Sequence, residues 1–233
     1  AFLFGCPRSG TTLVQQIVST SNEVHTIRET HLVHKARYLK SKNYFKRIFS
    51  LLLINIASFK LGLKEFFFTI EQKKFFAKLN ACLLKEAKLA NKRIFLEKTP
   101  RHLYYFNELN ENFPNSKFIF VLRNPIDNAK SLLSASSQWN EFLTDYSIAN
   151  AYSRWLYDFN LILNYKNNPN AVVVYYDKLT HEKHYQDEIK KIENLLGIKV
   201  DIHNLLKSSN QIIEQKETWK KNNFSETIRF KKK

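Results

Sequence analysis

Residues 5–12, with the sequence GCPRSGTT, form the segment best suited to bind an anion. They follow the apolar residues 2–4 and precede a helical pattern, which is where phosphate-binding loops lie in α/β proteins. Thr11 stands where nucleotide triphosphatases have the lysine that binds the β- and γ-phosphates. Backbone N–H groups at the start of the helix, with the hydroxyls of Ser9, Thr11 and Thr12, can still donate to an anion. The loop therefore predicts a phosphate or sulfate site that is poorly suited to ATP.

Two other interpretations of this loop can be tested by counting. A cysteine phosphatase would need an Arg six positions after Cys6, where this chain has Thr12, so that class of enzyme is excluded. A structural turn remains open, although two of the 4 glycines in the chain lie in this loop.

A cation follows a later apolar segment, where P-loop triphosphatases have a magnesium ligand. Arg123 comes directly after residues 118–122, FIFVL, which are typical of a buried strand. An Asp at this position holds the metal in the triphosphatases, whereas an Arg can bind a phosphate through two nitrogens. Ser131 lies eight residues on, two helical turns along, and Asp127 is typical of a helix-start charge. The pattern predicts an anion site that needs no metal.

These residues require a scaffold in which strands alternate with helices. Four apolar segments are too short for helices and are predicted as buried strands, at residues 2–4, 94–96, 118–122 and 171–175. Helical patterns separate them, at residues 11–19, about 30–90, 125–131, 148–163 and 181–196. The alternation predicts an α/β fold with a three-layer parallel sheet and a P-loop-like phosphate loop.

The region of about 30–90 is too long for one crossover between strands. It predicts a helical insertion, forming a lid or the acceptor side, within a single domain over residues 1–233. Its residues 48–59 are the most apolar stretch of the chain, but twelve residues fall short of the roughly 20 that span a bilayer. This stretch predicts a buried helix, or one that lines an apolar cleft, and no membrane span is expected in this fragment.

Charge and cysteine content limit the classes of partner and compartment. There are 37 Lys and Arg against 21 Asp and Glu, a net charge of +16, which favours an anionic partner: nucleic acid, an anionic membrane, a sulfated or phosphorylated ligand, or an acidic acceptor. Residues 35–47 hold six basic and no acidic residues, typical of a solvated helix face or a surface for an acidic acceptor. No nucleic-acid-binding motif is recognisable, so no nucleic-acid partner is expected. Two cysteines cannot form a disulfide framework, which favours a reducing compartment.

Four segments resemble, in this order, the sulfotransferases that use 3′-phosphoadenosine 5′-phosphosulfate (PAPS), and the likeness covers most of the chain. PRSGTT resembles the 5′-phosphosulfate loop of that family. FLEKTPRHL resembles the next segment in its tyrosylprotein, bacterial and carbohydrate branches, and LRNPIDNAKS resembles its 3′-phosphate motif. VVVYYDKL and the later LLGI resemble its late strand and closing helix. The family implies transfer of a sulfuryl group from PAPS to an acceptor hydroxyl, which leaves 3′-phosphoadenosine 5′-phosphate (PAP).

The resemblance also implies which residues contact the donor. The 5′-phosphosulfate would be held by Arg8, Ser9, Gly10, Thr11 and Thr12. Arg123 and Ser131 would hold the 3′-phosphate, and Tyr176 matches a donor-contacting tyrosine of the tyrosylprotein branch. That branch has a further Arg twelve positions after the 3′-phosphate Arg, where this chain has Ala135, so one contact on the adenosine side is lost or replaced.

Sulfuryl transfer needs a base at the acceptor oxygen and cations at the leaving phosphate. Glu29 resembles the glutamate base of several branches, and Lys98 resembles the lysine that stabilises the leaving oxygen, a role that Arg8 would share. Three other interpretations stay open. Glu29 could be a helix-start carboxylate, and Lys98 could form a surface pair with Glu97. A histidine could also replace Glu29 as the base, since small-molecule members use a His; the candidates are His31, which is nearest to Glu29 in the sequence, and His25, His34 and His102.

The sequence therefore predicts a PAPS-dependent sulfotransferase that needs no metal and acts on a hydroxyl of a glycan, a peptide tyrosine or a small molecule. A P-loop nucleotide kinase-like phosphotransferase is the alternative, disfavoured by Thr11 and Arg123. A nucleic-acid-binding module is a third class, which the charge alone allows. A bacterial cytoplasmic location is favoured, with the Golgi lumen as the other option if an anchor lies upstream.

Overall fold

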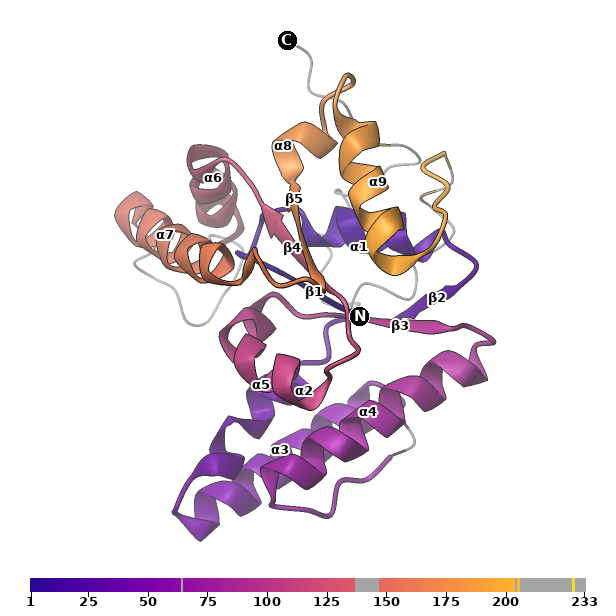
Figure 1. Ribbon diagram of the computed structural model, residues 1–233. Helices are drawn as coiled ribbons and strands as arrows, with labels where there is room; N and C mark the ends of the chain where they lie inside the picture. The colour runs from indigo at the N-terminus through magenta and orange to yellow at the C-terminus, as the bar shows by residue number, and fades with distance from the viewer. Residues whose placement is uncertain (64, 137–146, 204, 206–227, 229–233) are drawn as a thin grey trace.

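A five-stranded parallel sheet forms the centre of the computed structural model, which describes residues 1–63, 65–136, 147–203, 205 and 228. The strand order is β2-β3-β1-β4-β5 (Figure 1). The strands are β1 (Phe2–Gly5), β2 (Val24–Thr26), β3 (Ile94–Lys98), β4 (Phe118–Leu122) and β5 (Ala171–Tyr175). The four predicted strands and the three-layer α/β fold are confirmed, but the predicted burial of β5 is wrong, because β5 is an edge strand in which Val174 is buried and the other residues are partly or fully exposed. The edge strand β2 was not predicted, because its sequence VHT is short and has no apolar run.

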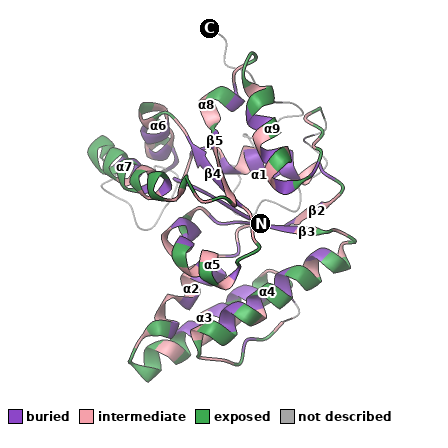
Figure 2. Cartoon of the chain, viewed as in Figure 1, coloured by how far each residue is buried: buried purple, intermediate pink, exposed green. Residues whose placement is uncertain are grey.

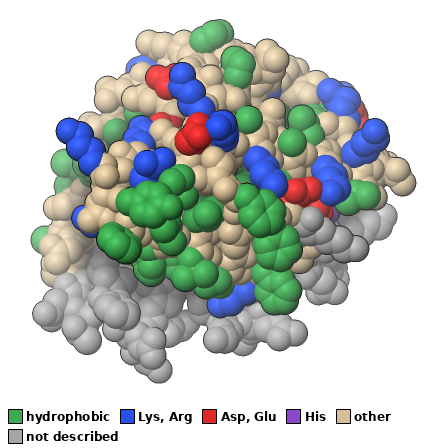
Figure 3. All heavy atoms as spheres, turned by 90° about the horizontal axis from the view of Figure 1, so that it is seen from below, with side chains coloured by type: hydrophobic (Ala, Val, Ile, Leu, Met, Phe, Trp, Pro, Cys, Tyr) green, Lys and Arg blue, Asp and Glu red, His purple; other side chains and the backbone are tan. Residues whose placement is uncertain are grey.

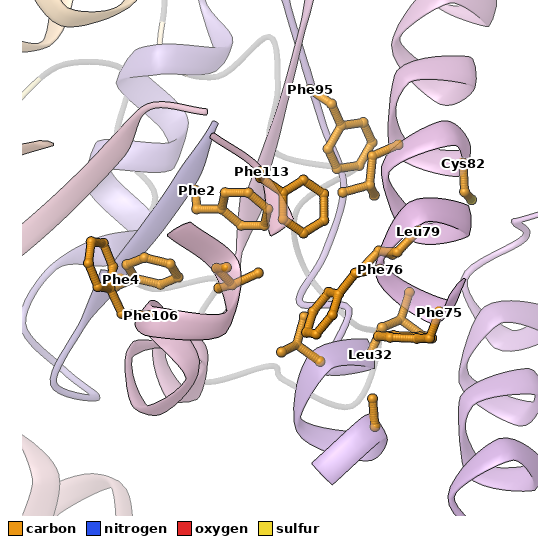
Figure 4. Packing of buried hydrophobic residues seen from close by; sticks show 14 of the residues in the cluster. Phe2, Phe4, Leu32, Phe75, Phe76, Leu79, Cys82, Phe95, Phe106 and Phe113 are labelled. Carbon is orange, nitrogen blue, oxygen red and sulfur yellow. The ribbon is translucent and has the colours of Figure 1, made fainter. Parts of the chain in front are cut away.

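The two faces of the sheet carry different kinds of side chain, because successive residues of a strand point to opposite sides. Phe2 and Phe4 of β1 enter a phenylalanine-rich core, whereas Leu3 enters an aliphatic core on the other face. In the same way β4 sends Phe118 and Phe120 to the first core. Figure 4 shows Phe2 and Phe4 close to rings from outside the sheet, and the Phe2 and Phe113 ring centroids are 5.1 Å apart.

Helices cover both faces (Figure 1). The aliphatic core includes residues of α1 (Thr11–Ser19), α8 (Tyr176–Leu179) and α9 (Tyr185–Leu196). The phenylalanine-rich core includes residues of η2 (Pro100–Tyr105), α5 (Phe106–Asn112) and α7 (Ile148–Tyr165). A small cluster of Ala129, Leu132 and Ala151 joins α6 (Pro125–Ser136) to α7. Gly197 ends α9 with a left-handed φ of 63°, as its position just past the predicted helix indicates.

The predicted insertion is helical but divided into several elements. It contains α2 (Leu32–Lys35), η1 (Ala36–Lys40), α3 (Tyr44–Lys60) and α4 (Gln72–Leu89), and the two long helices lie below the sheet in Figure 1. Asn43 begins α3 by accepting a hydrogen bond from the backbone N of Lys46 at 3.1 Å. Ile54 of α3 and Phe75 of α4 belong to the phenylalanine-rich core, so the insertion is packed onto the rest of the domain.

The prediction of a buried helix at residues 48–59 is correct for the helix and wrong for its burial. The side of α3 that faces the protein carries Ser50, Ile54, Ala57 and Ser58. Most of its larger apolar residues are exposed, as the exposed colouring along α3 shows (Figure 2). Small inward residues let α3 approach the core, and the bulky residues are left on the outside. No described helix is long and apolar enough to cross a membrane.

Candidate active site

The carboxyl ends of β1, β3 and β4 form one edge of the sheet and carry most of the predicted site residues. β1 lies between the other two strands, with Gly5 opposite Val121 of β4 and Leu3 opposite Lys98 of β3. Residues 5–12, here called the anion loop, therefore leave the sheet between Lys98 on one side and Arg123 on the other. Open parallel sheets bind their ligands at this edge.

A cavity of about 400 Å³ lies at the opposite edge, at the amino ends of the strands. Its lining includes Ala1, Ile94 and Lys117 and none of the predicted site residues. The cavity is therefore separate from the candidate site.

The backbone of the anion loop is held in a conformation that residues other than glycine rarely adopt. Arg8 has a φ of 71° and Gly10 a φ of 99°, both in the left-handed region. For a residue with a Cβ this conformation costs about 1–3 kcal/mol. The turn is closed by a 3.0 Å hydrogen bond from the backbone N of Ser9 to the carbonyl of Cys6. Strain at Arg8 indicates that the loop is shaped for a purpose beyond reversing the chain.

Two guanidinium groups meet at this loop. Arg8 Nε donates to Ser131 Oγ (3.2 Å), and Arg123 Nη1 donates to the backbone carbonyl of Arg8 (3.0 Å). The Arg123 guanidinium also lies over the Tyr176 ring, 4.8 Å from its centroid. Burial, and then the positive charge of Arg123, lower the pKa of Arg8. Two neighbouring cations repel each other, and a bound anion would relieve that repulsion.

Two buried polar atoms of this cluster have no hydrogen-bond partner within the part of the chain that the structure describes. They are Ser9 Oγ and Arg123 Nε. A buried donor without a partner costs about 1–3 kcal/mol, and a phosphate or sulfate oxygen could accept from either atom. Thr11, which is 5% exposed, and Thr12 begin α1 directly after this loop. The residues present therefore fit an anionic group.

Gly10 lies directly against the ring of Tyr176. A Cβ at position 10 would stand 2.1 Å from Tyr176 Cδ2 and 2.5 Å from Cε2. Only glycine therefore lets the start of α1 and the start of α8 approach this closely.

Gly10→Ala is expected to lower the free energy of unfolding by more than the roughly 1–3 kcal/mol that left-handed backbone costs, because the methyl group also displaces the Tyr176 ring. Gly62→Ala is the matched control, since Gly62 has a φ of 74° and none of the residues that the structure describes lies within 4 Å of the added Cβ. Urea denaturation measures both losses. Equal losses in the two variants would contradict the close contact.

A second group of predicted residues lies after β2 and at the end of β3. Lys98 Nζ donates to Glu29 Oε1 at 2.6 Å, and His31 Nε2 lies 3.5 Å from Glu29 Oε2. The Lys98 side chain is 1% exposed and that of Glu29 is 19% exposed, so the ion pair is largely shielded from water. The structure thus brings together Glu29, its alternative His31, and Lys98.

Two of the simpler interpretations of these residues are wrong. Lys98 is not a surface residue paired with Glu97, because it is buried and bonds to Glu29. Glu29 is not a helix-start carboxylate, because α2 begins at Leu32 and has no acidic residue in its first turn. His31 stays an alternative base: burial lowers its pKa, which Glu29 offsets only in part, so the neutral imidazole is favoured.

A buried carboxylate, Glu97, lies behind this ion pair. It accepts hydrogen bonds from Thr30 Oγ1 (2.8 Å) and Thr99 Oγ1 (2.6 Å), and its other oxygen bonds His102 Nδ1 (2.9 Å). Burial alone would raise the pKa of Glu97, but the charge of His102 and these hydrogen bonds together lower it. Because Thr30 and Thr99 are next to the ion-pair residues in the chain, this network fixes the backbone that carries them.

Sequence reasoning missed the residues that support the loop from behind. Asn128 of α6 donates to the carbonyl of Pro7 (3.2 Å) and accepts from Cys6 Sγ (3.4 Å). Burial is the main cause that raises the pKa of Cys6, so its thiol stays protonated. Trp155 of α7 donates from Nε1 to the carbonyl of Arg123 (3.0 Å). In the sequence Trp155 belongs to the apolar pattern of a helix. The one signal of a polar contact is its indole N–H, because a buried tryptophan usually donates a hydrogen bond.

The model of the sulfotransferase family matches residues 1–201, most of the chain. The chain belongs to the sulfotransferase family. The match includes both segments predicted to bind anions and the ion pair described above, and the predicted family of this sulfotransferase is confirmed. A comparison with curated proteins finds no matching sequence.

Solved structures share the fold of this sulfotransferase. The sulfotransferase domain from the curacin biosynthetic pathway is 16% identical, with a TM-score of 0.63, over 92% of this chain and 80% of that one. The sulfotransferase domain of the Synechococcus PCC 7002 olefin synthase is 20% identical, with a TM-score of 0.58, over 88% of this chain and 76% of that one. A mouse sulfotransferase complexed with PAP is 15% identical, with a TM-score of 0.50, over 96% of this chain and 65% of that one. At these identities the likeness concerns the fold.

Membership of the family supports sulfuryl transfer as the general reaction of this sulfotransferase. Among the residues that the structure describes, no three His, Cys, Asp or Glu side chains gather into a group that could hold a metal ion.

Proposed function

We propose that this sulfotransferase moves the sulfuryl group of PAPS to an acceptor hydroxyl. The observation that carries the proposal is the direct meeting of Arg8, from the loop after β1, with Arg123, from the end of β4. PAPS carries a phosphosulfate at the 5′ position of its ribose and a phosphate at the 3′ position. Two cationic segments that meet at one edge of the sheet suit a ligand with two anionic groups. The PAP bound in the mouse relative supports this choice of donor.

The residues that would hold the donor are those of the two segments. We assign the 5′-phosphosulfate to Arg8, Ser9, Gly10, Thr11 and Thr12, because the buried Ser9 Oγ has no hydrogen-bond partner among the described residues. We assign the 3′-phosphate to Arg123 and Ser131, with Tyr176 packed against both the loop and the Arg123 guanidinium. When bound, PAPS supplies a sulfuryl group on a phosphate leaving group.

The ion pair is assigned to the chemistry at the acceptor. Glu29 is the proposed general base, which takes the proton from the attacking hydroxyl. Lys98 holds Glu29 Oε1 at 2.6 Å and thereby orients the carboxylate. With Arg8 it also places positive charge where negative charge grows on the leaving phosphate. Shielding from water strengthens both effects.

The acceptor side is assigned to the helical insertion within the single domain. The chain enters α2 directly after Glu29 and His31, so residues of the insertion are the nearest in sequence to the proposed base. The basic residues 35–47 begin there and suit an acidic acceptor. Glycan, peptide tyrosine and small-molecule hydroxyls are the candidate acceptors.

Calorimetric titration with PAP, PAPS and ATP tests the donor. PAP and PAPS are expected to bind more tightly than ATP, with affinities that EDTA does not change. A preference for ATP with magnesium would overturn the proposal and favour the kinase-like alternative. A screen of hydroxyl acceptors with ³⁵S-labelled PAPS then identifies the acceptor class.

Arg123→Ala is expected to weaken PAP binding about 10- to 100-fold, because a charged hydrogen-bond partner contributes about 1.5–3 kcal/mol. Arg93→Ala is the matched control, since the Arg93 side chain is 57% exposed and pairs with Glu23 at the other end of the sheet. Calorimetry on both variants measures the change. Unchanged PAP affinity in Arg123→Ala would remove Arg123 from the donor site.

A further inference from the structure

Helix α3 carries its large apolar residues on the outside. The exposed residues are Phe45 (81%), Ile48 (42%), Phe49 (52%), Leu52 (55%), Ile56 (43%) and Phe59 (77%), here called the α3 apolar face. Apart from the adjacent Ile48 and Phe49, successive members are three or four positions apart, so the set forms one stripe along the helix. An ordinary surface helix turns such a stripe toward the core. This reversal indicates that the stripe has a partner outside the domain.

The apolar surface continues beyond the helix. Phe66 is 57% exposed and Phe68 is 83% exposed, and their ring centroids are 6.2 Å apart. Figure 3, which views the molecule from the side of α3 and α4, shows hydrophobic side chains gathered on this face, with Lys and Arg side chains at the margins and a smaller number of Asp and Glu side chains beside them. Phe45, Phe59 and Phe68 are each more than three-quarters exposed, so they protrude into solvent. Protruding side chains can enter a soft surface that has no fixed shape.

Positive charge predominates around this surface, although Glu65 and Glu71 lie close to Phe66 and Phe68 in the sequence and Glu65 pairs with Lys78 and Lys85. The sequence from residue 30 to residue 64 contains eight Lys and Arg and no Asp or Glu. Lys42, Lys46 and Lys60 are exposed beside the α3 apolar face, and Lys78 Nζ lies 5.3 Å from the centroid of the Phe68 ring. An apolar stripe bordered by lysines is the pattern of helices that lie in the interface of anionic membranes.

We propose that the α3 apolar face, with Phe66 and Phe68, docks on the surface of an anionic lipid bilayer. The phenylalanine, leucine and isoleucine side chains enter the boundary between headgroups and acyl chains, and the lysines contact the anionic headgroups. A second copy of this chain is a poorer occupant, because two faces that both carry lysine borders repel each other. The proposal does not depend on the donor or the acceptor of the sulfuryl transfer.

Sedimentation with lipid vesicles tests the proposal on the full chain. The protein is expected to sediment with phosphatidylglycerol–phosphatidylcholine vesicles, and much less with phosphatidylcholine alone or in 1 M salt. Phe45→Ser/Phe59→Ser should weaken vesicle binding at least about tenfold. Ile148→Ser/Tyr157→Ser is the matched control, because these side chains of α7 are 59% and 58% exposed. It should bind vesicles like the unaltered protein.

Thermal unfolding and PAP titration confirm that each variant is folded, and exposed positions make loss of folding unexpected. Vesicle binding that is equal in the two double variants would overturn the proposal. So would the absence of vesicle binding together with a dimer, seen by sedimentation velocity, that Phe45→Ser/Phe59→Ser dissociates. That result would assign the face to a second copy of the chain.

Discussion

Glu29→Gln is expected to lower turnover by about two to four powers of ten while leaving PAP affinity unchanged. The amide keeps the size of the side chain and can still accept a hydrogen bond from Lys98, which lies at 2.6 Å. It cannot take a proton from the acceptor hydroxyl. A loss of turnover at unchanged donor affinity separates the proposed base from a residue that only holds the donor. Steady-state kinetics with the acceptor from the screen, with PAP calorimetry beside it, measures both quantities.

Two further variants make this result decisive. Glu71→Gln is the control, because the Glu71 side chain is 57% exposed and pairs with the surface residue Lys74, so turnover should not change. His31→Gln tests the alternative base, which lies 3.5 Å from Glu29 Oε2. Retained turnover in Glu29→Gln, together with a large loss in His31→Gln, would move the base to His31.

Glu97→Ala is expected to lower the free energy of unfolding by about 3–5 kcal/mol, the usual loss when one partner of a buried charged network is removed. Glu97 is 2% exposed and accepts hydrogen bonds from Thr30, Thr99 and His102. All three would be left without this acceptor in the core. Glu97→Gln keeps the volume and one oxygen, so its loss should be smaller, about 1–3 kcal/mol. Urea denaturation measures both variants, and Glu71→Ala, which should change stability by less than about 0.5 kcal/mol, is the control.

The same carboxylate predicts a pH dependence of stability. The pKa of Glu97 in the folded protein lies below its ordinary value of 4.5. Its contribution to stability is therefore complete above pH 4.5 and is lost as the pH falls through the lower pKa of the folded state. Glu97→Gln should show a shallower loss of stability in that acid range. An identical acid dependence in the two proteins would show that Glu97 is not held ionised by its neighbours.

Most of the fold could be predicted from local patterns. Strands of a parallel sheet that are covered on both faces are continuous apolar runs, which are easy to recognise in a sequence. Helix α1 matches its predicted bounds at residues 11–19. Burial of α3 could not be predicted in this way. An apolar count does not say which side of a helix meets the core, and in α3 the small residues Ser50, Ala57 and Ser58 do so.

Residue type and position at a strand end were enough to select Arg8 and Arg123 as candidates, and the structure brings these two residues into contact. The contacts between elements could not be predicted. The spacing of residues in the sequence does not indicate that Lys98 bonds to Glu29, which is 69 residues away. Nor does it indicate that Trp155 donates a hydrogen bond to the backbone carbonyl of Arg123. Such contacts depend on the strand order, which places β3 and β4 on either side of β1. That order becomes visible only in the folded chain.

Both thiols of the chain are buried in the folded protein, which makes it convenient to label. Cys6 and Cys82 are 1% and 2% exposed, and burial raises the pKa of Cys82 to about 12. Because the thiolate is the reactive form, maleimide dyes should leave the native cysteines unmodified at neutral pH. A Phe59→Cys variant would then offer one accessible thiol without prior removal of the others. An environment-sensitive fluorophore attached there would report directly when this part of α3 leaves water.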